Sequence, residues 1–563
     1  MKYFYIDDYN LLNNDFSKFN EKKDFIITST FRIKLFLVKE KFTSFYYLGD
    51  SLNSNKKNKL KIFYFKEIQK LLIFLDNYKN IKKKLINSNI NIFYNSFRYR
   101  LASELTAYLS ILYSLKNFLH IYKIKKITFY GNFGFNLIDP KVFLVDLNYR
   151  LKKIKIVKFD SKKIIKLESS LKAKLLNLKF FQIIYFLKKL LSNIIPLKFK
   201  KNLVLEPLFD FFYSSYSIKK NYFIKFDDFQ FSYNNNNSNK KDYNKFLKPI
   251  NKKFKDLFSF EVIDFIIQNG FVIDHMTHEI SLKLNKMSLK SKFENLIWCC
   301  DPNELSANLI SLAKNKKINI YGIQHGGSYS LQNYELLNYY SDFSLCDKYL
   351  SYGFSKKLKR KKLMDVGSFK SSYFKKRLIN YKSECEVMFI PTAMVEDFYY
   401  FNQLDQHKKY QLQMQISKIS FENENMSILK IPEKYDLNHF PIIDKIKSLY
   451  PRTKIVKNTV YESIFKYRPK IVIIDCLSTS IYECLYFPVE IVLFVDKFNI
   501  PQSDILKKLK KRIHIVKNLN EFKKILMKIN KTNNLKINNE FLNEFFLLRD
   551  NKDTNFIKNS LIN

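Results

Sequence analysis

The residues best placed for chemistry stand in one short stretch, NIYGIQHGGS, which runs from Asn319 to Ser328. Its first half has the pattern of a buried strand, and its second half places His325 before Gly326 and Gly327. Glycine tolerates positive φ and lets a backbone come close to a ligand. The carboxyl end of a strand is where open α/β sheets bind ligands. We therefore predict that His325 is the chemical centre of the protein.

A second polar loop, DCLSTSIYE over residues 475–483, leads from a buried strand into a helix. Free N–H groups at a helix N-terminus form a phosphate site. The hydroxyls of Ser478, Thr479 and Ser480 would add donors to that site. Glu483, one turn later, could accept hydrogen bonds from ribose hydroxyls. The alternative is that Ser480 and Glu483 form only a capping box, which would not exclude phosphate binding.

Asp301 and Glu304 are alternative catalytic bases. They follow the apolar run 296–300 and precede a helix, so they lie beside the strand that carries His325. An acidic residue, a proline and a glutamate in this order also mark a helix start. Helix capping is therefore the reading that we favour for this pair.

The sequence predicts neither a metal site nor a disulfide. His275 and His278 form a pair with no third ligand in view, which is more often structural than metal-binding. The six cysteines contain no CxxC pair and lie mainly inside apolar runs. We expect buried free thiols in a reducing compartment.

The charge of the chain is strongly positive, with 98 Lys and Arg against 52 Asp and Glu. Such an excess suggests a non-catalytic protein that binds nucleic acid or an anionic membrane, which is the alternative of another class. However, Lys, Asn, Ile, Phe and Tyr are all abundant while Gly, Pro and Trp are scarce, as AT-rich genomes produce. No RNA-binding signature is present. Codon bias therefore explains most of the excess, and nucleic acid is not expected as a partner.

The sequence predicts a cytoplasmic protein. It shows no signal-peptide pattern and no apolar run of about 18 residues that could span a membrane. A lysine-rich helical segment over 164–203 is a candidate for peripheral contact with the inner face of the membrane. A core helix is the alternative for this segment, and it is the one we favour.

Alternating strand and helix patterns predict an α/β protein with two domains. The first domain is expected over 1–375, with a polar loop inserted at about 232–247, and the second over 376–563, with a helical tail. In the first domain we expect strands at 127–130, 142–145, 154–159, 296–300, 318–323, 348–352 and 363–366. In the second we expect strands at 387–392, 428–431, 453–457, 471–474 and 491–495.

Several of these motifs resemble, in the same order, those of glycosyltransferases with the two-domain GT-B fold. They are VMFIPT at 387–392, LKIP at 429–432, and the region 471–495 with its polar loop. Gln324-His325-Gly326 resembles the Gln-x-His-Gly or Trp-His-Gly motif of the same enzymes. The likeness is to the bacterial surface-polysaccharide branch, which includes capsule Kdo transferases, CDP-glycerol glycerophosphotransferases and an O-antigen-region transferase family.

The resemblance implies a GT-B-like fold, with two Rossmann-like domains that face each other across a cleft. It implies inverting, metal-independent transfer of a sugar from a nucleotide-activated donor to a surface glycan or lipid-linked glycan, with no cofactor. His325 would be the general base or would position acceptor and donor phosphate. The donor-binding residues would be Gln324, Gly326, Gly327, Thr392, Asp475, Ser478, Thr479, Ser480 and Glu483.

The chain departs from the pattern at one strand end. The glycerophosphotransferases and some sialyltransferases carry a His-Pro pair where this chain has Ile431-Pro432, and His439 follows later. A phosphate-binding histidine is therefore missing at this strand end, which counts against a CMP or CDP donor. A CMP-linked acidic sugar and, as the alternative, a CDP-glycerol-type polyol phosphate are the donors considered.

Overall fold

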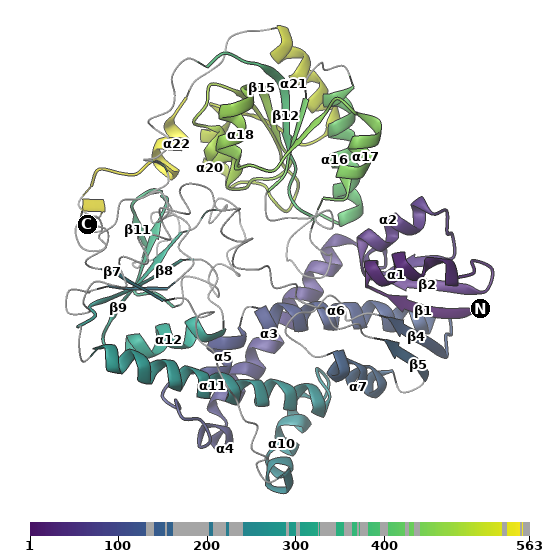
Figure 1. The fold of residues 1–563 in the computed structure, drawn as a ribbon, viewed down its shortest axis with the longest axis vertical. Helices are drawn as coiled ribbons and strands as arrows, with labels where there is room; N and C mark the ends of the chain where they lie inside the picture. Colours follow the sequence, from purple (N-terminus) through teal and green to yellow (C-terminus); the bar gives the residue numbers. More distant parts are fainter. Residues whose placement is uncertain are drawn as a thin grey trace.

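The computed structural model contains three parallel β-sheets, each in an α/β unit of its own (Figure 1). It describes residues 1–555 except 99, 131–139, 152–154, 161–201, 206–220, 225–239, 289–291, 300–303, 325, 327–344, 354–362, 369–370, 372–380, 395–403, 423–426, 433–439, 532–537 and 552–553. Most of the basic segment 164–203 thus lies outside the described residues.

The first unit has a five-stranded sheet with strand order β3-β2-β1-β4-β5. The strands are β1 (Lys2–Ile6), β2 (Asp24–Thr28), β3 (Phe45–Tyr47), β4 (Lys126–Tyr130) and β5 (Lys155–Asp160). The helices are α1 (Tyr9–Asp15), α2 (Phe31–Lys39), α3 (Ser54–Asn77), α4 (Lys79–Lys82), α5 (Ile92–Phe97), α6 (Arg100–Ile121) and α7 (Pro140–Arg150). The buried apolar residues of the long helices α3 and α6 belong to the same hydrophobic core as those of the second sheet.

The strand predicted at 142–145 is wrong, because these residues lie in α7. Pro140 occupies the first helical position, where its missing N–H costs nothing. Asp146 is fully buried and binds Arg150 one turn later at 2.8 Å. It also accepts hydrogen bonds from the hydroxyl of Tyr108 at 2.6 Å and the backbone of Ser259 at 2.7 Å. A short apolar run fits strand and helix alike, and these tertiary contacts decide for the helix.

The second unit has a six-stranded sheet with order β11-β10-β9-β8-β6-β7. Its strands are β6 (Asn202–Leu205), β7 (Asn221–Ile224), β8 (Asn295–Cys299), β9 (Asn319–Ile323), β10 (Lys348–Ser351) and β11 (Leu363–Asp365). Its helices are α10 (Lys240–Phe254), α11 (Phe260–Ser288) and α12 (Glu304–Asn315). The polar loop predicted at 232–247 is wrong from residue 240 onward, since α10 begins there and buries Leu247 and Ile250.

The third unit has a six-stranded sheet with order β14-β13-β12-β15-β16-β17. Its strands are β12 (Cys385–Ile390), β13 (Ser427–Lys430), β14 (Lys454–Val456), β15 (Pro469–Ile474), β16 (Glu490–Phe494) and β17 (His514–Val516). Its helices are α16 (Gln406–Phe421), α17 (Ile442–Leu449), α18 (Val460–Tyr467), α19 (Ser480–Cys484), α20 (Ser503–Lys510), α21 (Leu519–Lys531) and α22 (Glu540–Phe545). The predicted helical tail therefore contains one strand, β17, whose three residues are too few for a periodic signal.

Helices cover both faces of the third sheet (Figure 1). In β12, Val387 and Phe389 pack towards the core shared with α16, α17 and α21, whereas Met388 and Ile390 face the core shared with α18 and α20. This alternation confirms the Rossmann-like character that the sequence predicts for this region. The α/β class is confirmed for all three units.

The range 1–375, which we predict as one domain, holds two separate sheets. The second and third sheets are the Rossmann-like pair that carries the motifs, and the first sheet is an additional unit. The chain end returns from the third unit to the second: Ser368 donates to the carbonyl of Phe546, and Arg549 to that of Val366. Among the residues described, no helix is both long and apolar enough to cross a membrane.

The first and third units meet where the start of α3 faces the start of α16. Asp405, the N-cap residue of α16, pairs with the buried ammonium of Lys57 and accepts a hydrogen bond from Ser54. Burial by itself raises the pKa of Asp405, but the hydrogen bonds from Lys57 and Ser54 outweigh it and leave the pKa below its usual value. Residues of one unit therefore hold this carboxylate of the other unit in its charged form.

The D405N variant is expected to lose about 3 kcal/mol of stability at neutral pH, because Lys57 stays buried without its counter-charge. The contribution of the wild-type carboxylate is complete above the unfolded-state pKa near 4 and disappears as pH falls through the lowered folded-state pKa. Urea denaturation at pH 7 and pH 3 should therefore show a difference from wild type that shrinks at pH 3. The control K408A removes an exposed lysine whose Nζ lies 3.7 Å from Oδ2 of Asp405, and it is expected to lower stability by under about 1 kcal/mol. Equal losses for D405N at both pH values would contradict this account.

Candidate functional site

The candidate site lies at the carboxyl edge of the third sheet, between β12 and β15. These strands are neighbours, and the chain continues from β12 to β13 on one side and from β15 to β16 on the other. The strand order therefore reverses between Ile390 and Ile474, which end the two strands. In open α/β sheets a crevice at such a reversal is the usual place for a ligand.

A hydrogen-bonded network joins the two strand ends. One carboxylate oxygen of Asp475 accepts from the backbone N–H of Thr392 at 2.7 Å and from its hydroxyl at 2.6 Å. The other oxygen accepts from Nε2 of Gln413 at 2.6 Å, and the same nitrogen donates to the carbonyl of Thr392 at 2.9 Å. Asp475 and Gln413 are buried. The network fixes the backbone of both loops at the reversal point, so Asp475 and Thr392 are positioning residues in this structure.

One ammonium group lies beside this network. Lys409 on α16 donates to the carbonyl of Ala393 at 3.0 Å. Its charge acts on Cys476 and on Asp496, which follows β16. Burial nevertheless raises the pKa of Asp496 above its usual value and the pKa of the Cys476 thiol to about 11. Cys476 is therefore a neutral thiol at physiological pH, and Lys409 supplies positive charge at this edge.

The loop after β15 brings its hydroxyls to the same edge. Ser478, Thr479 and Ser480 are half-buried and precede or begin α19. Thr479 is the N-cap residue and makes no side-chain capping bond, so the capping box considered for Ser480 and Glu483 does not form. With five residues α19 is short, so these hydroxyls would supply much of any phosphate binding.

Glu483 contacts the start of α18. It is buried, and its carboxylate accepts from the backbone N–H of Tyr461 at 2.8 Å, at the start of α18. This contact ties α19 to α18. A role for Glu483 towards a ribose stays a prediction.

The loop after β9 meets the loop after β15. Gln324 is buried; it accepts from the backbone of Tyr352 at 2.9 Å, and its Nε2 lies 3.4 Å from the carbonyl of Gly326. Gly326 has φ +143°, and a Cβ added to it would lie 2.9 Å from Oγ1 of Thr479. The second and third sheets thus bring their carboxyl edges together at these residues.

Other predicted residues are placed only in part. His325, Gly327 and Asp301 lie outside the described residues. Glu304 is the first described residue of α12, and the helix cap predicted at Asp301 is not tested. Nothing further is described of the Glu304 side chain, so its catalytic role stays a prediction.

The sequence does not predict three polar residues at the carboxyl edge of the third sheet, which are Lys409, Gln413 and Asp496. Two of them lie inside α16, where Lys and Gln are ordinary helix formers. The complete burial of Gln413 is seen only in the structure. The described part of the chain contains no group of three His, Cys, Asp or Glu side chains that could hold a metal ion.

Comparison with known proteins gives a family. Residues 136–517, more than half of the chain, match the model of a family described as LIC12162 family transferase. No curated protein matches the chain.

Three solved structures share part of the arrangement. The first, a putative UDP-N-acetylglucosamine 2-epimerase from Listeria monocytogenes, is 9% identical with a TM-score of 0.34 and covers 51% of this chain and 78% of its own. Spinosyn rhamnosyltransferase SpnG is 6% identical with a TM-score of 0.29, over 48% of this chain and 73% of its own. The wall teichoic acid polymerase TagF is 13% identical with a TM-score of 0.28, and the match covers 51% of this chain and 84% of its own. Likenesses at this level carry no conclusion about activity.

Proposed function

The chain belongs to the LIC12162 family of transferases, and we propose that it moves a sugar from a nucleotide-activated donor to a glycan acceptor. In finer terms, we propose inversion at the sugar, no metal or cofactor, and a surface glycan or lipid-linked glycan as acceptor. A CMP-linked acidic sugar is the proposed donor. The reaction is proposed for the cytoplasm, with contact at the inner face of the membrane.

One observation carries the proposal: Gly326, next to His325 in the chain, packs on Thr479 at the reversal point of the third sheet. The histidine loop of the second sheet and the hydroxyl loop of the third therefore meet at one place. A base from one side and phosphate donors from the other are what transfer from a nucleotide-sugar requires.

The proposed chemistry uses these groups in sequence. The imidazole of His325 takes the proton from an acceptor hydroxyl. The acceptor oxygen then bonds to the anomeric carbon while the bond from that carbon to the phosphate oxygen breaks. The leaving nucleotide keeps the electron pair. Lys409 and the hydroxyls of Ser478 and Thr479 stabilise the negative charge that it gains.

The K409M variant tests the donor side of this proposal. Removing the ammonium at the sheet edge is expected to weaken nucleotide-sugar binding about tenfold, which corresponds to about 1.4 kcal/mol. Isothermal titration of the full chain with CMP-, CDP-, UDP- and GDP-sugars measures this loss and identifies the nucleotide. The control K418M removes an exposed lysine from the same helix and should leave affinity unchanged.

Two outcomes would count against the proposal. Equal losses for K409M and K418M would mean that only the overall charge matters. Turnover with CDP-glycerol, and with none of the nucleotide-sugars, would replace sugar transfer by polyol-phosphate transfer.

A further inference from the structure

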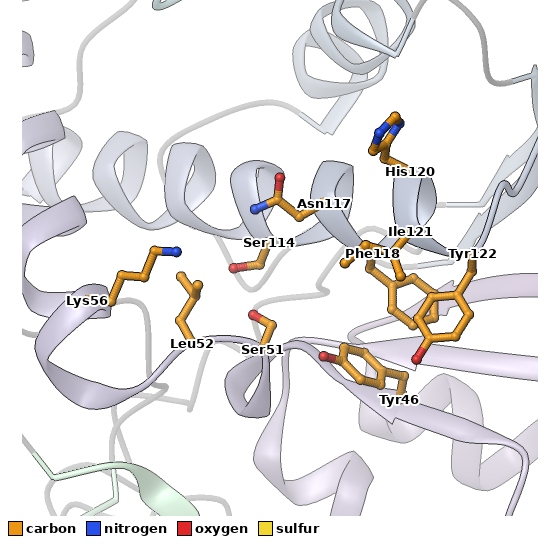
Figure 2. A pocket seen from close by; sticks show the side chains of 10 residues that line it. All are labelled: Tyr46, Ser51, Leu52, Lys56, Ser114, Asn117, Phe118, His120, Ile121 and Tyr122. Atoms are coloured by element: carbon orange, nitrogen blue, oxygen red, sulfur yellow. The ribbon is translucent and has the colours of Figure 1, made fainter.

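A separate pocket of about 300 Å³ opens in the first unit, between the start of α3 and the end of α6 (Figure 2). We call it the α3–α6 pocket. It belongs to a different sheet from the site described above. Its lining residues are Tyr46, Ser51, Leu52, Lys56, Ser114, Asn117, Phe118, His120, Ile121 and Tyr122.

A buried hydroxyl without a partner faces this pocket. Ser114 is fully buried, yet its Oγ has no hydrogen-bond partner in the described part of the chain. A serine inside a helix commonly bonds the carbonyl one turn back, as Ser110 does with Thr106 at 2.8 Å. Figure 2 shows the Ser114 hydroxyl turned towards Ser51 across the pocket instead. An unpaired buried hydroxyl is unfavourable, so a ligand that bonds it gains from doing so.

The charge at the pocket mouth is positive. Lys56, in the first turn of α3, lines the pocket and forms no ion pair with any described residue. The nearby carboxylate of Asp50 is already paired with Lys34 at 2.6 Å. The N-terminus of the 24-residue helix α3 adds the positive end of its dipole. An anionic group at the mouth would therefore find an available ammonium.

Aromatic rings form one wall. The rings of Tyr46 and Phe118 are stacked with centroids 4.4 Å apart. The ring centroids of Phe118 and Tyr122 are 4.5 Å apart. Ser51 and Asn117 add polar groups to the lining. An apolar face next to hydroxyl and amide groups suits a ring that bears C–H bonds on its faces and hydroxyls on its rim.

We propose that the α3–α6 pocket binds a monosaccharide-sized ligand that carries one carboxylate or phosphate. The ring would lie beside Tyr46 and Tyr122, which flank the buried ring of Phe118, one ring hydroxyl would pair with Ser114, and the anionic group would meet Lys56. The volume is at the lower limit of small-molecule sites, which excludes a whole nucleotide-sugar. This proposal does not rest on the proposed function, because it concerns binding alone.

Isothermal titration of the full chain with glucuronate, glucose 1-phosphate, glucose and inorganic phosphate tests the proposal. At least one of the two anionic sugars should bind at least tenfold more tightly than glucose and than inorganic phosphate. K56M should reduce that affinity at least tenfold and S114A about fivefold, whereas the control K59M, an exposed lysine on α3 outside the pocket, should change nothing.

The melting midpoint of the S114A variant, measured without and with ligand, gives a second test. Without ligand its melting midpoint should equal or exceed that of wild type, because an unpaired buried hydroxyl is removed. In saturating ligand its midpoint should rise less than that of wild type. No binding by either anionic sugar, or binding that K56M and S114A leave unchanged, would overturn the proposal.

Discussion

The H325A variant is expected to lose about a thousandfold in kcat while it keeps the melting temperature of wild type. A positioned general base contributes about 10² to 10⁴ in rate, and His325 is the ionisable side chain in the stretch QHGGS over residues 324–328. Initial rates with the donor identified by titration measure the loss. Circular dichroism of the same sample verifies the fold.

The pH dependence sharpens this test. In wild type, kcat/KM should rise with pH as the imidazole loses its proton, because the base must be neutral to accept one. In H325A this limb should vanish. H278A, which removes a half-buried histidine from α11, is the matched control and should keep both the rate and the limb. Turnover of H325A within threefold of wild type would refute the assignment of His325.

The elements around the site could be predicted because their signals are local. β9, β12 and β15 are apolar runs bounded by polar loops, and the sequence predicts the ends of each strand to within two residues. Their parallel pairing follows from the helices between them. The two loops that end in Gly326 and Thr479 could therefore be named from sequence as candidate neighbours.

Other features depend on contacts that no local pattern contains. The segment 142–145 lies in a helix because the buried carboxylate of Asp146 accepts hydrogen bonds from residues 38 and 113 positions away. The division of 1–375 into two sheets depends on which strands pair, and β6 and β7 are four-residue strands with little periodicity. Lys409 and Gln413 reach the site because α16 packs beside β12, so only the assembled sheet identifies them.

The G326A variant is expected to lose about a hundredfold in kcat/KM and about 1–3 kcal/mol of overall stability. Two effects act together. A φ of +143° is strained for any residue with a Cβ, at about 1–3 kcal/mol. The added methyl would also lie 2.9 Å from Oγ1 and 3.1 Å from Cγ2 of Thr479. Either Thr479 or the histidine loop must then move, and a displacement of about 1 Å at a catalytic group costs about a hundredfold.

A double-mutant cycle with T479A separates the two effects. T479A removes both atoms that the new methyl would meet, so G326A should do less damage in the T479A background than in wild type. A coupling energy of about 1 kcal/mol or more would show that the two loops press on each other during turnover. The residual loss in the double variant would measure backbone strain and the lost hydroxyl. Strict additivity of the two substitutions would mean that the loops are apart during turnover. The contact between Gly326 and Thr479 would then no longer support the proposed function.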